Sequence, residues 1–242
     1  MAHTSTTYTH STTGIKLYII KADAADVELV SLVDQYNRNG KFLQDTRYYG
    51  MNASWFGYYK DEDDGYTYAG IENIAYQDGV NLGAAGTGHY SNVGDCMVYF
   101  KNNAINYAEG ITLSSDSRIP KTSGTWAQTG LGLNLGSTNW LQMFKAQPHV
   151  EDYSTGSAKR TAMVIDKANN KIYLIATTDS VTVSNFRSAI MSYLGLVDQT
   201  LYSNWKAILL DGGRSTQIFG RTFNVQPTLS RAVPQIISVG TY

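Results

Sequence analysis

The chain has 242 residues, 43% of them hydrophobic, and a formal net charge of −1. This length and composition suit one large domain with a sizeable core. The near-neutral charge argues against a nucleic-acid partner, and the apolar runs are far too short to insert into a membrane.

The first 13 residues are rich in Ser and Thr and show no apolar periodicity. Such a composition predicts a flexible or partner-ordered arm, so we place the domain at residues 14–242. The start also lacks a basic segment followed by an apolar one. We therefore expect a soluble protein without a secretion signal.

The first half of the domain is predicted to be mostly β-structure. Apolar patterns predict strands at Ile15–Ile20 and Val27–Val33. Lys41–Tyr49 is predicted to form a short helix that leads into a strand ending near Asn52. Short apolar segments broken by Gly and Asn predict hairpins over Tyr66–Gly110.

A hairpin and a helix are predicted in the second half. Thr161–Asp166 and Lys171–Thr177 are joined by two Asn residues, which can adopt the positive φ values that a tight turn needs. Thr182–Leu194 has a helical apolar stripe, with Thr182 or Ser184 to cap its start and Gly195 to end it.

The remaining predicted strands are Ala207–Leu210 and Pro234–Val239. The order of elements indicates an α+β fold, built as a single domain with a mixed, mostly antiparallel sheet and few helices.

The segment from Lys206 to Phe219 has the strongest pattern of a functional site. Four apolar residues are followed by Asp211, two glycines, and then Ser215 and Thr216. Glycines let the backbone turn so that successive N–H groups can point at one anion, with hydroxyl donors beside them. A plain β-hairpin, with Asp-Gly as its turn, is the structural alternative.

Two further segments join this turn in a recognisable order. The two segments before the turn are Met51-Asn-Ala-Ser-Trp-Phe56 and Lys159-Arg-Thr-Ala-Met-Val-Ile-Asp166. The turn itself is Leu209-Leu-Asp-Gly-Gly-Arg-Ser215, and a last segment, Arg231-Ala-Val-Pro-Gln235, follows it. The series resembles the phosphodiester glycosidase family, whose pattern runs Ile-Asn-Gly-x-Phe-Phe, Pro-Arg-Thr-Ala-x-Gly-x-Asp, Asn-Leu-Asp-Gly-Gly-Gly-Ser and Arg-Pro-Val-Ala-Asn. The resemblance extends roughly from Ile15 to Val239.

The resemblance implies a hydrolase that splits a sugar from a phosphodiester at the anomeric oxygen, giving free sugar and a phosphomonoester. A carboxylate would stabilise positive charge at the sugar C1, and cations with backbone amides would stabilise the departing phosphate. The catalytic residues implied are Asp211, Arg160 and Asn52. The substrate-binding residues implied are Ser54, Thr161, Gly212, Gly213, Arg214, Ser215, Thr216 and Arg231.

Purely structural roles stay open for several of these residues. Asp211 can cap the glycine turn, Arg160 and Arg231 can form structural ion pairs, and Asn52 can satisfy buried backbone groups. Arg214, where the family has a third glycine, either fills a pocket that relatives leave open or binds phosphate.

Other candidate groups have weaker support. His89 and His149 are possible general acids without a partner fixed by spacing, and the acidic run at residues 61–64 lacks the alternation of an EF-hand loop. Cys96 is the only cysteine and is predicted to lie in the core. We expect neither a metal nor a cofactor.

The biological setting is suggested by composition and by the start of the chain. The chain has 18 Tyr and 22 Gly but only 16% charged residues, which suits glycan contact and a virion-associated or extracellular protein. Because the start shows no secretion signal, we expect a phage-borne protein, and the resemblance implies that it acts on a sugar-phosphate or glycopolymer such as teichoic acid. The alternatives are a non-catalytic glycan-binding tail module on the same fold and a structural subunit that forms a homo-oligomer.

Overall fold

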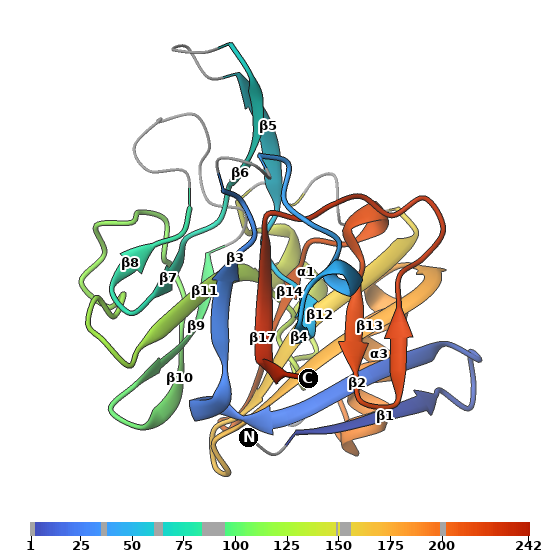
Figure 1. Ribbon diagram of the computed structural model, residues 1–242. Helices are drawn as coiled ribbons and strands as arrows, with labels where there is room; N and C mark the ends of the chain where they lie inside the picture. Colours follow the sequence, from blue (N-terminus) through green and yellow to red (C-terminus); the bar gives the residue numbers. More distant parts are fainter. Residues whose placement is uncertain are drawn as a thin grey trace.

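The computed structural model of the chain describes residues 3–34, 38–60, 65–83, 95–148, 150, 156–198 and 202–242 (Figure 1). Within these ranges the strands form a large sheet, a smaller sheet and a separate two-stranded hairpin. All strand pairs between named elements in this part of the chain are antiparallel. The predicted single-domain fold of mostly antiparallel sheet with few helices is confirmed.

The large sheet has ten described strands, with β9 and β10 attached to the side of β11. Its strands, in spatial order, are β1 (Thr4–Thr9), β2 (Lys16–Asp23), β13 (Lys171–Val181), β12 (Ala158–Asp166), β14 (Trp205–Leu210), β11 (Trp126–Gly132), β7 (Ala75–Gln77) and β8 (Val80–Asn81). Off this path, β9 (Cys96–Lys101) pairs with β11, and β10 (Ala104–Ala108) pairs with β9.

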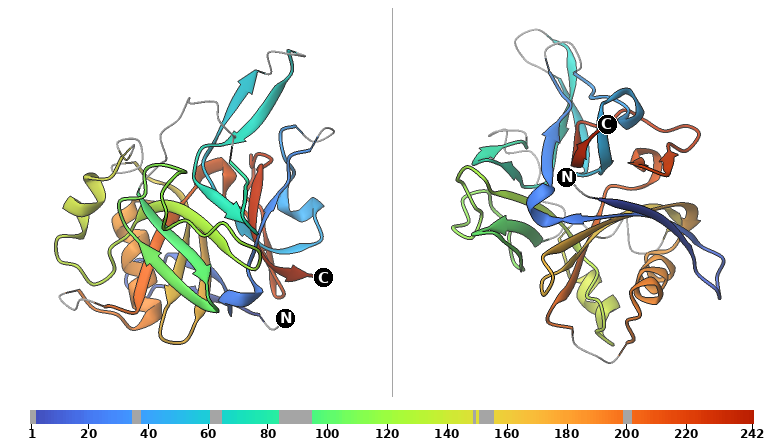
Figure 2. Two further views of the ribbon diagram at one scale, coloured as in Figure 1. Left: turned by 90° about the vertical axis from the view of Figure 1, so that its left-hand side faces the viewer. Right: turned by 60° about the horizontal axis from the view of Figure 1, so that its bottom comes forward.

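The smaller sheet has five described strands and lies against one face of the large one. Its strands, in order, are β16 (Phe223–Val225), β15 (Ile218–Gly220), β4 (Tyr48–Asn52), β17 (Gln235–Thr241) and β3 (Glu28–Ser31). The two-stranded hairpin of β5 (Phe56–Lys60) and β6 (Thr67–Ile71) projects beyond both sheets (Figures 1 and 2).

The main core fills the space between the two sheets. Alternate residues of the central strands, such as Met163 and Ile208, meet Met51 and Ile237 of the smaller sheet, and all four are buried. Burial of apolar surface at about 25 cal/mol per Å² drives this packing. The next residue in each strand points the other way, so the central strands read as continuous apolar runs.

The opposite face of the large sheet is covered by the helix α3 (Val183–Leu194), with the shorter α1 (Trp140–Lys145) nearby (Figure 2). The Thr182 hydroxyl accepts from the Asn185 N–H at 3.2 Å, and Gly195 ends the helix at φ 67°. Phe186 and Ile190 are fully buried against the sheet. The predicted helix and its caps are confirmed, as is the preceding hairpin of β12 and β13.

Among the described residues, no helix is long and apolar enough to cross a membrane.

Two predictions about local structure are wrong. The middle of the expected flexible arm, Thr4–Thr9, is strand β1, which pairs with β2 from Thr4↔Lys21 to Thr9↔Lys16. A Thr-rich run suits an edge strand, because threonine is β-branched and only one side of the strand needs a partner.

The expected helix over Lys41–Tyr49 is reduced to one 3-10 turn, Leu43–Asp45. The Leu43 N–H donates to the Gln217 side chain at 2.8 Å, and the chain then extends into β4. A tertiary contact to a distant glutamine thus replaces the continued helical bonding that local propensity favours.

Candidate active site

Asp211 lies immediately after β14, at the junction of the two sheets. Its N–H donates to the Ala53 carbonyl at 3.1 Å. Its own carbonyl accepts two side-chain hydrogen bonds, from Asn52 Nδ2 at 2.7 Å and from Thr161 Oγ1 at 2.5 Å. The backbone of Asp211 is therefore fixed from both β4 and β12.

The carboxylate of Asp211 is buried beside one partly exposed cation. Arg231 Nη2 lies 3.2 Å from Asp211 Oδ2, and the two side chains are 33% and 7% exposed, respectively. Burial raises the pKa of Asp211 from 3.8 to about 6, while Arg231, the Ser215 hydroxyl and the Gly212 N–H act in the opposite direction. Desolvation wins because one solvent-screened guanidinium does not replace the hydration that the carboxylate loses.

Arg231 is held in place by several contacts. Its Nε donates to Ser215 Oγ at 2.7 Å, and its guanidinium lies 4.2 Å from the centroid of the Phe56 ring. The backbone N–H of Arg231 donates to the Arg214 carbonyl at 2.9 Å. The cation is therefore supported from the glycine turn and from the start of the hairpin.

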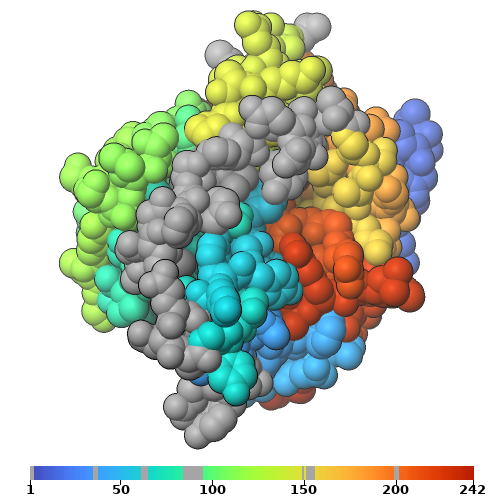
Figure 3. Space-filling view, turned by 90° about the horizontal axis from the view of Figure 1, so that it is seen from above, coloured from blue at the N-terminus to red at the C-terminus, as the bar shows by residue number. Residues whose placement is uncertain are grey.

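The contact between Arg231 and Phe56 brings two segments that are distant in sequence together at the surface. Seen from above, the orange-red surface of the C-terminal part of the chain borders the cyan surface of the hairpin of β5 and β6 (Figure 3). Arg231 and Phe56 join these two regions beside Asp211.

The glycine turn is shaped by a close backbone approach. A Cβ on Gly212 would lie 2.5 Å from the carbonyl oxygen of Lys159, which excludes any larger residue without a shift of β12. Gly213 has φ 58°, a conformation that favours glycine, and opens the short 3-10 turn Gly213–Ser215. The predicted active-site turn is therefore a strand end followed by a 3-10 turn, not a tight two-residue hairpin.

Asn52 and Ser54 are occupied by bonds within the protein. Asn52 Oδ1 accepts from the Gln217 N–H at 2.9 Å, so both ends of its amide bind backbone groups. Ser54 Oγ donates to Gln235 at 2.5 Å and accepts from Gln128 Nε2 at 2.8 Å. These contacts support the structural alternative for Asn52 and give Ser54 the same kind of role.

Arg160 is buried and directed along the sheet. Its Nε donates to the Val181 carbonyl at 3.2 Å and its Nη2 to the Gly156 carbonyl at 2.5 Å. Those bonds tie the bulged start of β12 to the end of β13. Arg231 is the cation that lowers the pKa of Asp211 against the effect of burial.

The remaining predicted positions differ in exposure. Arg214 is exposed, and its Nε donates to the Leu229 carbonyl at 2.9 Å. Thr216 is fully buried, and its Oγ1 has no hydrogen-bond partner among the described residues. His89, His149 and the acidic run at 61–64 lie outside the described residues.

Four supporting residues were not anticipated from the sequence: Phe56, Gln128, Gln217 and Gln235. Phe56 lies under the Arg231 guanidinium, and the three glutamines are buried hydrogen-bonding groups. A glutamine inside or directly before an apolar strand is the signal for such a role, because burial requires partners for its amide. Among the described residues, no group of three or more His, Cys, Asp or Glu side chains is placed to hold a metal ion.

Two facing antiparallel sheets thus hold a buried carboxylate beside a partly exposed guanidinium. Residues 76–240 match the phosphodiester glycosidase family, which is more than half of the chain. The chain therefore belongs to the phosphodiester glycosidase family. The match includes the Arg160, Asp211 and Arg231 segments and begins after Asn52.

Solved structures share the fold at low sequence identity. The catalytic domain of zebrafish N-acetylglucosamine-1-phosphodiester alpha-N-acetylglucosaminidase, auto-inhibited by its pro-peptide, is 13% identical, with a TM-score of 0.64 over 100% of this chain and 83% of that chain. A hypothetical protein from Synechocystis is 13% identical, with a TM-score of 0.50 over 98% of this chain and 61% of that one. A protein from Burkholderia pseudomallei is 12% identical, with a TM-score of 0.53 over 93% and 73%. No curated protein matches the sequence.

Proposed function

We propose that this protein hydrolyses glycosyl-1-phosphodiesters. The bond between the sugar C1 and the phosphodiester oxygen breaks, water supplies the new hydroxyl at C1, and a phosphomonoester leaves. The observation that carries the proposal is the buried Asp211 carboxylate beside the partly exposed Arg231 guanidinium, in a chain of the phosphodiester glycosidase family.

Asp211 is the proposed group for the sugar side of the reaction. Positive charge grows at C1 as the bond to the leaving oxygen weakens, and an adjacent carboxylate stabilises that charge or attacks the carbon. Because its pKa is about 6, Asp211 is ionised above about pH 6. Its buried position makes the electrostatic effect stronger than in water.

Arg231 is the proposed group for the phosphate side. One third of its side chain is exposed, so a phosphate can reach the guanidinium from solvent. The Gly212 N–H is already directed at the Asp211 carboxylate. We therefore assign phosphate binding to Arg231 and the adjoining Gly213 and Arg214, which are not buried, and we assign the Gly212 N–H to holding Asp211.

The remaining predicted residues are proposed to position this pair. Asn52 and Thr161 fix the carbonyl of Asp211, Arg160 ties β12 to β13, and Ser54 belongs to the glutamine network beside β4. These side chains fix the position of the Asp211 carboxylate. Both ends of the Asn52 amide are already bonded within the protein, so Asn52 has no polar atom left for sugar hydroxyls.

A cell-wall glycopolymer such as teichoic acid with sugar-1-phosphate links is the proposed natural substrate, and a phage-borne protein is the proposed setting. The Tyr-rich, weakly charged composition favours contact with sugar rings.

The test combines phosphorus NMR with a reducing-sugar assay on a panel of glycosyl-1-phosphodiesters and teichoic acids. The expected result is equal release of phosphomonoester and reducing sugar by the wild type and by Glu28→Gln, an exposed control on β3, with loss in Asp211→Asn. Phosphomonoester without free sugar would place cleavage on the other side of phosphorus. No product from a folded wild type would overturn the proposal.

A second candidate is a glycan-binding module without turnover, which requires that Arg214, standing where the family has a glycine, obstructs the site. Its side chain is exposed and bound to the Leu229 carbonyl. We expect Arg214→Gly to raise KM for phosphodiester substrates about tenfold with kcat unchanged, since an exposed cation binds the phosphate equally before and during reaction. Steady-state kinetics measures this effect. A gain in kcat/KM would instead show that Arg214 obstructs the site and would favour the binding module.

A further inference from the structure

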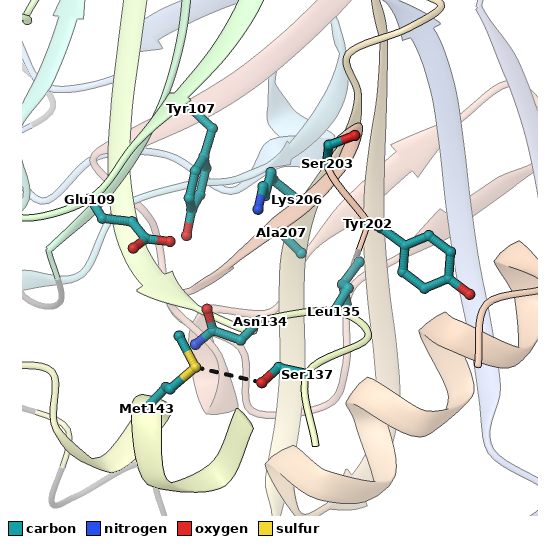
Figure 4. A pocket seen from close by; sticks show the side chains of 10 residues that line it. All are labelled: Tyr107, Glu109, Asn134, Leu135, Ser137, Met143, Tyr202, Ser203, Lys206 and Ala207. Carbon is teal, nitrogen blue, oxygen red and sulfur yellow. Dashed lines mark hydrogen bonds between the residues drawn. The ribbon is translucent and has the colours of Figure 1, made fainter. Parts of the chain in front are cut away.

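A cavity lies at the far end of β14 from Asp211. It has a volume of about 260 Å³, and Lys206 and Ala207 at the start of the strand line it (Figure 4). A strand advances about 3.3 Å per residue, so Lys206 and Asp211 are separated by about 16 Å along it. The cavity is therefore distinct from the candidate active site.

Two side chains of opposite charge line this cavity without forming an ion pair with each other. They are Lys206 and Glu109, the residue that follows β10. Within the described part of the chain neither forms an ion pair, with the other or with any third residue. Figure 4 shows them on either side of the Tyr107 ring, and Lys206 Nζ lies 5.6 Å from the centroid of that ring.

The rest of the wall is largely apolar. Leu135 is buried, Ala207 is buried, and Met143 is 43% exposed. The Met143 sulfur accepts from Ser137 Oγ at 3.6 Å. Methionine adapts to ligands of different shape because its side chain is unbranched and flexible.

We propose that this cavity binds a small zwitterion, namely a free α-amino acid with an apolar side chain. Its carboxylate pairs with Lys206, its ammonium pairs with Glu109, and its side chain packs against Leu135 and Met143. Two unpaired charges of opposite sign are complementary to a ligand that carries both. A sugar fits less well, because Lys206 lies over the tyrosine ring on which a sugar would stack.

Calorimetry and amide NMR with L-leucine, L-methionine and L-phenylalanine test the proposal. The controls are L-leucinamide, N-acetyl-L-leucine and glucose, which lack the carboxylate, the ammonium or both. We expect leucine to bind with Kd on the order of 1 mM, and each singly charged analogue about tenfold more weakly, which is the effect of losing one modest charge-assisted bond.

Two variants make the test specific. Lys206→Met is expected to bind leucine and leucinamide equally, and Glu109→Gln to bind leucine and N-acetyl-leucine equally. The exposed controls Lys101→Met and Glu28→Gln are expected to keep wild-type selectivity, and thermal unfolding verifies that each variant is folded. No binding to the wild type at about 10 mM ligand, equal binding of the three leucine compounds, or preference for glucose would overturn the proposal.

Discussion

The variant Asp211→Asn is expected to lose hydrolysis of glycosyl-1-phosphodiesters while becoming more stable than the wild type above pH 6. Removing a preorganised charge that acts on the transition state costs about 10³-fold in kcat. The amide keeps the shape of the carboxylate, so substrate affinity is expected to change much less. This combination separates a functional carboxylate from a turn-capping one, whose loss would lower stability.

The gain in stability follows from the pKa of Asp211, which burial raises from 3.8 to about 6. Between these values the folded protein holds a proton that the unfolded chain releases, so the wild type loses stability as pH rises through this window. At about 1.4 kcal/mol per pKa unit, the loss is on the order of 3 kcal/mol above pH 6. An asparagine does not titrate and avoids this loss.

Thermal unfolding of the wild type and Asp211→Asn from pH 4 to pH 8 measures the effect. The difference in Tm between them should be smallest at pH 4 and grow until about pH 6. Asp26→Asn serves as a control, a partly exposed aspartate in the turn before β3. A wild type that gains stability relative to the variant as pH rises would mean that the ion pair with Arg231 outweighs burial.

Local signals were sufficient for the elements that are stabilised locally. The helix α3 has its cap at Thr182 and its stop at Gly195, and the β12–β13 hairpin has Asn170 at φ 53° in its turn. Each of these features depends on residues a few positions apart. The two failures have different causes: β1 forms a hairpin with the next strand β2, which the Ser/Thr-rich sequence does not signal because it lacks apolar alternation, whereas Leu43 in Lys41–Tyr49 bonds to the distant Gln217.

The same distinction applies to the site. Asp211 was identified because its glycine turn is contiguous in sequence, and Arg231 because the family pattern closes with an arginine strand. No spacing rule predicts that Phe56 lies under Arg231, or that Gln217 uses Asn52 as its acceptor. Those contacts arise because β4 lies between β15 and β17 in the smaller sheet.

Asn52 is expected to act on Asp211 through the backbone, and Asn52→Ala should show this in both stability and rate. The variant leaves the buried Gln217 N–H without its acceptor and removes one of the two donors to the Asp211 carbonyl. An unsatisfied buried donor costs about 1–3 kcal/mol and the cavity adds to it, so we expect a loss of about 2–4 kcal/mol. Because the carboxylate moves, kcat should fall with little change in KM.

Thr161→Val is the matched variant, because it removes only the second donor to the same carbonyl. Either single substitution leaves that carbonyl one side-chain donor, and the double variant leaves it none. We therefore expect the double variant to lose about 1 kcal/mol more than the sum of the single losses, measured by denaturant unfolding. Additive losses would mean that the two donors do not share the task of fixing Asp211. An Asn52→Ala variant of unchanged stability but with no activity would return Asn52 to direct contact with the substrate.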